Sequence, residues 1–349
     1  MKNFLHHIIP DTTNIKEALV SLNTIKDTFL ILFVTDSSGR MIGTITDGDI
    51  RRSLITGTKM EDSVTKGTYR NFRYIHSNDL SLQQFKKYKE LGINLLPVLD
   101  NEYKIVDIKN LKDLKSFLPI DVVIMAGGEG QRLLPLTANT PKPLLKVGNK
   151  PIIEHNVDRL ISFGVQNIHI TLRYLGGQIE DYLGDGSKKN TSIKYVTEIE
   201  KLGTFGAVGL CSAFENDVVL VMNSDLLTNI DYEDFYRTFV DTNADMLIAA
   251  VPYTVQVPYA VLETNGNQVK CFAEKPTYTY HSNAGIYLIK KELLNRVSGM
   301  EFYDATDFMQ SLISEERNVQ TYTLMDYWLD IGMHEDYKTA QEAIKHIKL

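Results

Sequence analysis

Closely spaced glycines and two cations stand between residues 126 and 145. Gly127, Gly128 and Gly130 come directly after an apolar run, and Arg132 and Lys142 follow them. Glycines behind a buried strand let backbone N–H groups approach phosphate oxygens closely, and the two cations would offset phosphate charge. The segment has neither the Gly-Lys-Ser/Thr of a Walker A loop nor the third glycine of a dinucleotide fingerprint. It therefore predicts a phosphate-binding loop of another kind.

Two aspartates occupy positions where a metal ion could bind. Asp225 ends the triplet that follows the apolar run 218–222, and Asp330 lies within the segment 328–332. The carboxyl end of a strand is where open α/β sheets bind ligands. Carboxylate oxygens, completed by substrate phosphates, are the ligands that Mg²⁺ prefers. Taken alone, either aspartate fits a turn or a helix cap at least as well.

Apolar runs of strand length alternate with helical patterns from Ile120 onward. In one helical pattern, Ile153, Val157 and Leu160 share a face. Such alternation is typical of βαβ units and predicts an α/β domain with a Rossmann-like mixed, mostly parallel sheet. The expected strands are 121–126, 168–172, 218–222 and 246–251, and a closing helix is expected over 334–347.

The first 118 residues contain a weak internal repeat. Each copy has a helical pattern, an apolar strand and a turn before a second strand; the apolar strands are 29–34 and 95–99, and the second helical pattern is carried by Leu80, Phe85 and Tyr88. Aligning Asp49 with Asp113 gives a period of 64 residues. Because solenoid repeats have periods of about 20–50 residues, the longer period predicts two small paired domains.

Composition excludes several classes of protein. The net charge of −7 provides no positive field for a nucleic-acid backbone, so we expect no nucleic-acid partner. Cys211 and Cys271 are far apart and form no metal or disulfide motif, and we expect both to be buried small hydrophobic residues. The sequence shows neither a signal peptide nor an apolar run of about 18 residues, which predicts a cytoplasmic protein without a membrane partner.

The glycine-rich segment and the Thr-Pro-Lys-Pro-Leu-Leu at 140–145 together resemble the N-terminal signature of the sugar nucleotidylyltransferases, and the resemblance extends over 120–349. It implies a GT-A-like catalytic domain that joins a nucleoside triphosphate to a sugar 1-phosphate. Arg132 then corresponds to the arginine that grips the triphosphate, and Lys142 to the lysine that stabilises charge during attack on the α-phosphorus. Asp225 and Asp330 match the two aspartates that bind Mg²⁺.

The same resemblance assigns further binding residues. Glu274 and Lys275, in a Glu-Lys-Pro triplet, match residues that bind a sugar hydroxyl and the sugar phosphate. Asn283 and Gly285 match a sugar-contacting strand. The loop 202–207, with Gly203 and Thr204, resembles the loop that reads the base and, with Gly127, Gly128 and Gly130, would bind the nucleotide. A lysine at a strand end is, without this context, usually just solvated.

Glu198 bears on the choice of base. It stands four residues before Leu202, where relatives selective for uracil or thymine typically carry Gln. A carboxylate only accepts hydrogen bonds; guanine offers adjacent N1–H and N2–H donors, whereas uracil presents two carbonyls around one N–H. The residue therefore favours GTP over UTP, dTTP or CTP. Glu200 is an alternative for the same role, since the register could differ by two.

The segment 43–50 resembles the strand-turn-helix signature of CBS domains, which usually occur in tandem and often bind adenine nucleotides. The resemblance implies that Thr46 and Asp49 contact ribose and phosphate of an adenine or guanine regulatory nucleotide. Both residues would equally form a helix cap. The second copy departs from the signature at Asp107 and Asn110. We thus expect a tandem CBS α+β module over 1–118 and the catalytic domain over 119–349.

The combination most closely resembles the glucosamine-1-phosphate guanylyltransferases of bacterial legionaminic acid pathways. It implies transfer of GMP to glucosamine 1-phosphate for nonulosonic acid or other cell-surface glycan biosynthesis. Paired CBS modules commonly associate, so we also expect a homo-oligomer. Mannose and heptose 1-phosphates remain alternative acceptors. A catalytically inactive nucleotide sensor is a second class of function, but Arg132, Lys142, Asp225 and Asp330 are all present.

Overall fold

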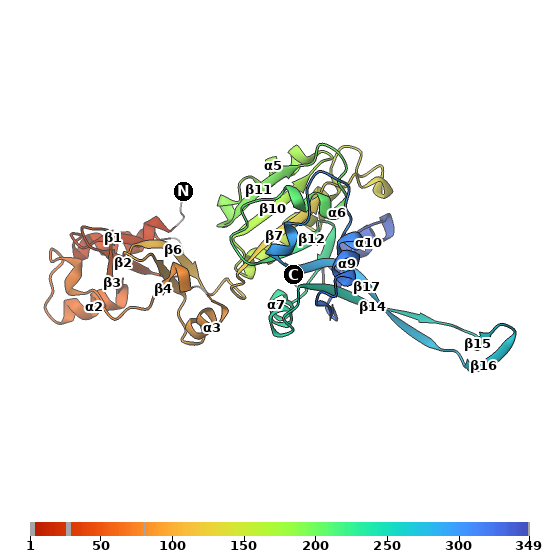
Figure 1. Ribbon diagram of the computed structural model, residues 1–349. Coiled ribbons are helices and arrows are strands. Elements are labelled where there is room, and N and C mark those ends of the chain that lie inside the picture. The colour runs from red at the N-terminus through yellow and green to blue at the C-terminus, as the bar shows by residue number, and fades with distance from the viewer. Residues whose placement is uncertain (1–3, 26–28, 80, 348–349) are drawn as a thin grey trace. The chain divides into compact units, whose positions relative to one another are not determined.

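The protein is described by a computed structural model that covers residues 4–25, 29–79 and 81–347. The chain divides into two compact units, unit 1 (Met1–Phe117) and unit 2 (Leu118–Leu349) (Figure 1). This division lies one residue before the boundary expected from the sequence. In the described part of the chain, no helix combines the length and the apolar character needed to cross a membrane.

Unit 1 contains the same arrangement of strands twice. In each copy the first strand pairs in parallel with the second, and the second pairs antiparallel with the third. The first copy consists of β1 (Ile8–Pro10), α1 (Ile15–Thr24), β2 (Ile31–Thr35), β3 (Met41–Thr46) and α2 (Asp47–Ile55). The second consists of β4 (Ile75–His76), α3 (Leu82–Glu90), β5 (Leu95–Leu99) and β6 (Ile105–Asn110). After β6 a turn over 111–113 stands where the first copy has α2.

The expected helical and strand patterns of unit 1 are present with small shifts in their bounds. The helix α1 begins with a capping box between Asn14 and Glu17, which satisfies two backbone N–H groups at its start. Its apolar face buries Ile15 and Leu22 against the sheet of the first copy. Leu80, which the sequence placed in the second helical pattern, lies outside the described residues.

Unit 2 is built on a sheet of seven strands in the order β11-β10-β7-β12-β17-β14-β18. Six strands run in one direction and only β17 runs the other way, which confirms the predicted mixed, mostly parallel sheet. The strands are β7 (Ile120–Ala126), β10 (Asn167–Leu172), β11 (Ser192–Thr197), β12 (Val218–Asn223), β14 (Met246–Gln256), β17 (Thr277–Lys290) and β18 (Val319–Thr323).

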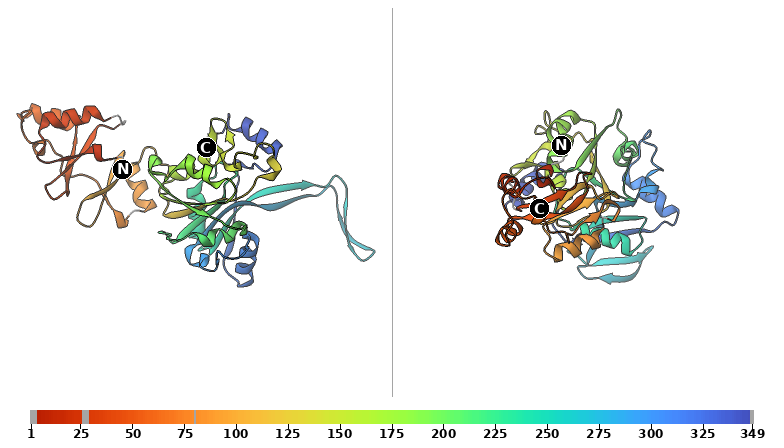
Figure 2. Two further views of the ribbon diagram at one scale, coloured as in Figure 1. Left: turned by 90° about the horizontal axis from the view of Figure 1, so that it is seen from above. Right: turned by 90° about the vertical axis from the view of Figure 1, so that its left-hand side faces the viewer.

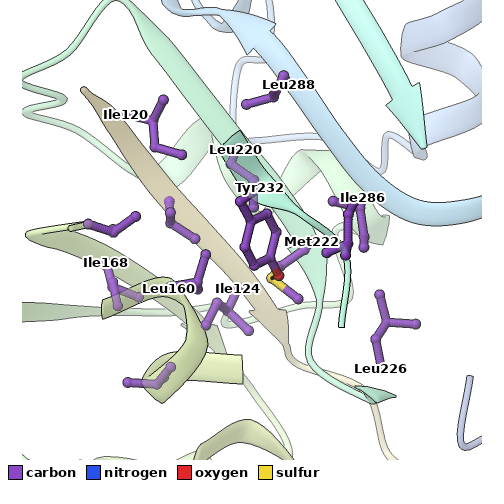
Figure 3. Packing of buried hydrophobic residues seen from close by; sticks show 14 of the residues in the cluster. Ile120, Ile124, Leu160, Ile168, Leu220, Met222, Leu226, Tyr232, Ile286 and Leu288 are labelled. Atoms are coloured by element: carbon purple, nitrogen blue, oxygen red, sulfur yellow. Dashed lines mark hydrogen bonds between the residues drawn. The ribbon is translucent and has the colours of Figure 1, made fainter. Parts of the chain in front are cut away.

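Helices cover both faces of this sheet, which is why its strands are apolar without alternation. On one face, Ile124 and Leu220 pack against Leu160 and Tyr232 (Figure 3). On the other face, Val221 belongs to a second apolar cluster. The first face is covered by α4 (Ile152–Ser162), α5 (Gly176–Leu183) and α7 (Tyr232–Asp241), and the second by α6 (Gly203–Gly206), α8 (Lys291–Leu294) and α9 (Ala305–Ser314).

Two small ladders complete unit 2. One joins β8 (Lys146–Val147) to β9 (Lys150–Pro151), and the other joins β13 (Leu226–Thr228) to β19 (Trp328–Asp330). The C-terminal helix α10 (His334–Ala343) packs its buried Ala340 into an apolar cluster with these ladders, so the expected closing helix is present but shorter.

A two-stranded extension leaves the sheet where β14 and β17 continue beyond their buried parts (Figures 1 and 2). It ends in the hairpin of β15 (Val261–Asn265) and β16 (Gln268–Ala273). We call residues 252–281 the arm. Cys271 lies on it and is exposed, so the expectation that both cysteines are buried was wrong for Cys271 and correct for Cys211. Within the described residues of unit 2 no second layer covers the arm, which leaves that thiol exposed.

Candidate active site

A cavity of about 350 Å³ lies at the carboxyl ends of the central strands of unit 2. Its lining includes Gly127 and Gly128 after β7, Thr171 at the end of β10, and Asn223 and Asp225 at and after the end of β12. The strand β7 has β10 on one side and β12 on the other, so the chain reverses its direction of winding there. Such a switch point leaves a crevice between the following loops, where ligands of open α/β sheets bind.

Asp225 and Asp330 are brought together by the β13–β19 ladder. Leu226 pairs with Asp330 across this ladder, and the Ile331 N–H donates to the Asp225 carbonyl at 3.1 Å. Lys142, in the short helix η5 (Lys142–Leu144), donates from Nζ to Oδ2 of Asp225, and its Nζ is 3.9 Å from Oδ1 of Asp330. The three side chains that the sequence singled out separately thus form one cluster.

The cluster has more negative charge than its single lysine balances. Oδ1 of Asp225 and Oδ1 of Asp330 are both buried without a hydrogen-bond partner. Burial raises the pKa of Asp330 above its ordinary range, and the nearby Asp225 raises it further. Buried, unpaired carboxylate oxygens are costly unless a cation reaches them. Within the described residues no group of three or more His, Cys, Asp and Glu could hold a metal, so such a cation would need ligands from elsewhere.

Arg132 lies at the edge of this cluster. It belongs to the short helix η4 (Gln131–Leu133), which directly follows Gly130, and it is exposed. Its guanidinium atoms lie 3.4–3.6 Å from the place that a Cβ would take at Gly332. Because Gly332 follows Asp330 by two residues, the arginine charge is close enough to oppose the rise in the pKa of that carboxyl.

Glu198 closes the other end of the cavity, just after β11. It is 7% exposed and lines the cavity, whereas Glu200 is exposed outside it. Burial raises the pKa of Glu198, against a hydrogen bond from the Leu202 N–H at 3.3 Å. A Cβ at Gly127 would lie 2.4 Å from its Oε1, so only glycine lets the carboxylate reach this place. The structure therefore brings Glu198, and not Glu200, to the cavity.

Gly203 and Thr204 line the cavity at the start of α6. The backbone N–H of Thr204 donates to Oδ1 of Asp304 at 3.0 Å, and its hydroxyl accepts from the Ala305 N–H at 2.7 Å. Asp304 is also the residue before α9, so these bonds fix the base of the loop to that helix.

The cavity is also lined by four polar residues that the sequence did not point to: Thr171, Arg173, Lys201 and Asp304. The Thr171 hydroxyl is buried without a hydrogen-bond partner, and Arg173 pairs with Glu129 at 2.9 Å. Thr171 and Arg173 stand at the carboxyl end of β10, so the strand-end argument that selected Asp225 would also have found them.

Asn283 and Gly285 lie where β17 passes the end of β12. The register of the β14–β17 pair shifts here, and Oδ1 of Asn283 accepts from the Gly285 N–H at 2.9 Å. Gly285 has a φ of +71°, and a Cβ there would lie 2.6 Å from Nδ2 of Asn223. Two constraints therefore require glycine at this position: the left-handed backbone conformation, and the lack of space for a Cβ beside Asn223, which lines the cavity.

Glu274 and Lys275 are not brought to the cavity. They lie on the arm, between β16 and β17, and both are exposed. Thr277, two residues beyond Lys275, pairs with Gln256 at the outer end of the β14–β17 ladder. The separation follows from the arm, because six residues of extended strand between Thr277 and Asn283 span about 20 Å.

In unit 1, Thr46 and Asp49 form a reciprocal cap at the start of α2. The Thr46 N–H donates to Oδ2 of Asp49 at 2.9 Å, and the Asp49 N–H donates to Oγ1 of Thr46 at 3.2 Å. Thr46 also lines a cavity of about 640 Å³, to which Asn71 and Arg73 contribute, but Asp49 does not line it. The structure thus contains the cap that the sequence left as an alternative, and a cavity beside it.

Unit 2 combines an open sheet, a glycine loop after β7, and a lysine between two carboxylates at the switch point of the sheet. This combination defines a nucleotide-binding α/β domain. A family model described as nucleotidyl transferase matches residues 121–346, and the chain belongs to this family.

The chain is 30% identical over 227 residues to the mannose-1-phosphate guanylyltransferase of Mycobacterium tuberculosis, covering 62% of each chain. It is also 30% identical over 232 residues to the bifunctional protein GlmU of Methanocaldococcus jannaschii, over 64% of this chain and 54% of that protein. The chain thus spans less than two thirds of the length of these relatives. Among solved structures, HddC from Yersinia pseudotuberculosis complexed with GMP-PN matches with a TM-score of 0.51 and 27% identity, over 64% of this chain and 99% of HddC.

Proposed function

We propose that unit 2 is a sugar-1-phosphate nucleotidylyltransferase that transfers GMP from GTP to a sugar 1-phosphate. The observation that carries this proposal is the cluster of Asp225, Asp330 and Lys142, whose two unpaired carboxylate oxygens stand beside a cavity closed by a buried Glu198. Membership of the nucleotidyl transferase family supports the reaction class. The relative in M. tuberculosis, by its name, acts on a sugar 1-phosphate.

In the proposed reaction an oxygen of the sugar phosphate attacks the α-phosphorus of GTP. One P–O bond forms, the bond from that phosphorus to the oxygen bridging to the β-phosphate breaks, and pyrophosphate leaves with the electron pair. Such transfer needs positioned reactants and positive charge at the phosphate oxygens rather than a covalent nucleophile. Lys142 supplies charge at the centre of the cluster, and Arg132 supplies it at the edge, toward the leaving pyrophosphate.

Asp225 and Asp330 are the residues that would hold a magnesium ion. Their unpaired oxygens fit a hard divalent cation, and two carboxylates leave the remaining positions to phosphate oxygens and water. A bound Mg²⁺ supplies positive charge that offsets the charge developing on the phosphate oxygens. The chain itself contributes the two carboxylates, and the glycine loop at 127–128 offers backbone N–H groups to the triphosphate.

Glu198 supports guanine as the base. Its carboxylate is removed from water, so an unpaired acceptor there would be costly, and two adjacent donors are the best match. Guanine supplies these donors at N1 and N2, whereas uracil, thymine and cytosine do not offer this pair. The solved complex of HddC with GMP-PN also contains a guanine nucleotide bound to a protein of this fold. UTP, dTTP and CTP remain the alternatives to be tested.

For the acceptor we propose glucosamine 1-phosphate, as the resemblance to the legionaminic acid enzymes implies. Mannose 1-phosphate is the second candidate because the M. tuberculosis relative carries that sugar in its name. Heptose 1-phosphate is the third. A product assay of four nucleoside triphosphates against these three sugars, with Mg²⁺, decides among them. Nucleotide binding without pyrophosphate release for any pair would instead favour an inactive sensor.

A matched pair of variants tests the cluster. Asp225→Asn is expected to lower pyrophosphate release by at least about 10²-fold, because the amide cannot balance a cation's charge. Asp217→Asn is the control: Asp217 precedes the same strand at its other end, and its side chain is fully exposed. Equal activity of both variants would exclude Asp225 from the reaction.

We also propose that unit 1 is a tandem CBS module that binds a regulatory nucleotide. The repeated strand arrangement and the cavity of about 640 Å³ beside Thr46 support it. Calorimetry of the full chain with AMP, ATP and a GDP-sugar tests this proposal. The variant Arg73→Ala, which removes a positive charge from the lining of the cavity, is measured beside the wild type. Binding that this variant leaves unchanged would assign the ligand to unit 2, and no binding of AMP or ATP would favour a structural role.

A further inference from the structure

Arg173 is a cation in the lining of the active-site cavity to which the proposed reaction gives no role. It is the first residue beyond β10, and β10 lies between β11 and β7 in the sheet. Glu198 and Gly127 are the first residues beyond these two neighbouring strands. The strands pair in parallel and in register, so the three residues form one row at the carboxyl edge of the sheet.

The carboxylate of Glu198 reaches along this row to the base of the Arg173 side chain. A Cβ at Gly127 would lie 2.4 Å from Oε1 of Glu198 and 3.4 Å from the Cβ of Arg173, so both atoms border on the same point. Burial raises the pKa of Glu198, and the charge of Arg173 opposes that rise. Arg173 therefore belongs to the end of the cavity at which Glu198 would read the base.

The guanidinium of Arg173 is paired with Glu129 of the glycine loop. Its Nη2 donates to Oε1 of Glu129 at 2.9 Å, and Gln131 donates to Oε2 of the same carboxylate at 2.7 Å. The side chains of the ion pair are 24% and 40% exposed. Because water competes for both partners, an ion pair of this kind contributes little stability. A ligand with well-aligned acceptors can thus take the guanidinium, and Glu129 keeps its hydrogen bond from Gln131.

Thr171 adds a polar group without a partner to the same part of the cavity. It stands two residues before Arg173, so strand alternation places both side chains on one face of the sheet. Thr171 is fully buried, and its Oγ1 has no hydrogen-bond partner among the described residues. A buried hydroxyl without a partner is costly, so this part of the cavity suits a ligand with polar edges.

Guanine has a pattern of donors and acceptors that an adjacent carboxylate and guanidinium can match. Its N1–H and N2–H donors suit Glu198, and its O6 and N7 acceptors lie on the adjoining edge of the base. When Glu198 accepts from N1–H, the neighbouring O6 is turned towards the residues beside Glu198. An acceptor removed from water there would be costly without a donor. A planar guanidinium offers two parallel N–H donors, which is the geometry that O6 and N7 require.

The triphosphate has other cations at the opposite end of the row of strands. Lys142 contacts Asp225, and Arg132 lies at the edge of the same cluster. Asp225 follows β12, which is three strand spacings from β11 in the sheet, or about 14 Å. Arg173 stands one spacing from the strand that Glu198 follows. Its position thus favours the base over the triphosphate as the group that it contacts.

We propose that Arg173 determines the base together with Glu198: when GTP binds, the guanidinium leaves Glu129 and donates to O6 and N7 of guanine. This inference rests on the proposed function, since it places GTP in this cavity. Adenine carries an amino donor where guanine carries O6, so the same arginine disfavours ATP.

Two GTP analogues, each without one recognised group, test the proposal on the full chain with Mg²⁺ and a sugar 1-phosphate. 7-Deaza-GTP lacks N7, whereas ITP lacks the N2 amino group and keeps O6 and N7. In the wild type, 7-deaza-GTP should lose about 10-fold in kcat/KM of pyrophosphate release relative to GTP, the worth of one charged hydrogen bond. Arg173→Ala should reduce this penalty to less than about 2-fold and leave the penalty for ITP unchanged. Each ratio is measured on one protein, so it does not depend on the folded fraction.

Two further variants sharpen the test. Lys201→Ala is the matched control, because it removes another cation from the lining of the same cavity and should keep the penalty for 7-deaza-GTP. Glu129→Gln frees Arg173 from its ion pair and should lower KM for GTP by about 2-fold; an unchanged or raised KM would overturn the exchange of partners.

Three results would overturn the role of Arg173 in reading the base. These are a wild type without a penalty for 7-deaza-GTP, a penalty that Arg173→Ala leaves at its full size, and a penalty that Lys201→Ala removes equally. Equal losses with GTP, ATP and UTP in Arg173→Ala would instead assign the arginine to the triphosphate.

The failure of this proposal is distinguishable from the failure of the proposed function. If GTP and 7-deaza-GTP release pyrophosphate equally well, the proposed function stands and the role of Arg173 fails. If no nucleotide releases pyrophosphate, the proposed function fails. Competition between 7-deaza-GTP and GTP for binding to the wild type and to Arg173→Ala then still tests the arginine, because the substitution lies in unit 2.

Discussion

The two halves of strand β17 show how differently one strand can be stabilised. The inner half, over 284–289, is buried under helices on both faces of the sheet. The outer half, over 277–282, has the same partner strand and continuous backbone pairing, yet it is exposed on both faces. Backbone pairing alone contributes little net stability, so the inner half holds the fold together while the outer half depends on what it meets.

The largest difference between the two halves is expected in unfolding free energy. Leu288→Ala removes a fully buried side chain of the inner half and should cost about 2–5 kcal/mol, through lost apolar burial and the cavity left behind. Tyr278→Ala in the outer half should cost less than about 0.5 kcal/mol in the monomer. Urea unfolding followed by the fluorescence of Trp328, the only tryptophan, measures both. Equal costs would show that the outer half stabilises the fold as much as the inner half does.

The next largest effect concerns the pKa of Glu198, which lies buried in the cavity at the end of the sheet. The pKa of Glu198 is raised above its ordinary value of 4.5, mainly by burial. The carboxylate is the form that accepts from guanine, so GTP binding should be strongest above the raised pKa and should weaken as the pH falls through it. Glu198→Gln should weaken GTP binding by about 10-fold or more, the worth of a charged hydrogen bond, and remove this pH dependence. Titration of GTP binding between pH 7 and the acid limit of stability checks the prediction.

Substituting a glycine near the cavity and a glycine on the arm compares the cost of backbone strain at the two places. Gly285→Ala should cost about 1–3 kcal/mol and reduce activity, because the new Cβ meets Asn223 and the φ is left-handed. Gly266→Ala, in the hairpin of the arm, has a φ of +58° but no atom within 4 Å of the new Cβ. It should cost about 1 kcal/mol and leave activity unchanged. If Gly266→Ala reduced activity as much as Gly285→Ala, the contact with Asn223 would not be the cause.

The smallest effect concerns the two cysteines. Burial raises the pKa of Cys211 to about 12, so its thiol should resist maleimide in the folded protein. Cys271 on the arm is exposed, and its hydrogen bond to Glu263 raises its pKa. Glu263→Gln lowers that pKa, so labelling of Cys271 at pH 7 should become faster by a few-fold. Mass spectrometry of labelled peptides measures both thiols, and Cys271→Ser is the control.

The sequence predicted the sheet well because its strands are covered on both faces. The runs at 121–126, 168–172 and 218–222 read as continuous apolar segments, and each lies within an observed strand. The extension of β14 to Gln256 and the early start of β17 at Thr277 could not be predicted in this way. Apolar and polar residues alternate in these outer parts of the two strands, and no core packs against them. Such a pattern does not predict how far the strands extend.

The candidate site was predictable where position along a strand decides chemistry. Asp225 and the glycine loop follow buried strands directly, whereas Glu198 was found by its spacing from the loop at 202–207, because no strand was expected at β11. Thr171 and Arg173 were missed because their residue types alone suggest no reaction. The distance between Lys275 and the cavity depends on the path of the arm, which no local pattern of residues encodes.

The β13–β19 ladder has a consequence for the order in which the protein assembles. It joins Leu226 to Asp330, so the two carboxylates of the cluster meet only when a loop of about one hundred residues closes. During synthesis on the ribosome, the sheet from β7 to β17 can form while Asp330 has not yet been made. The cluster is therefore completed late, and a nascent chain that already holds the glycine loop and Glu198 has only one of the two carboxylates of the proposed metal site.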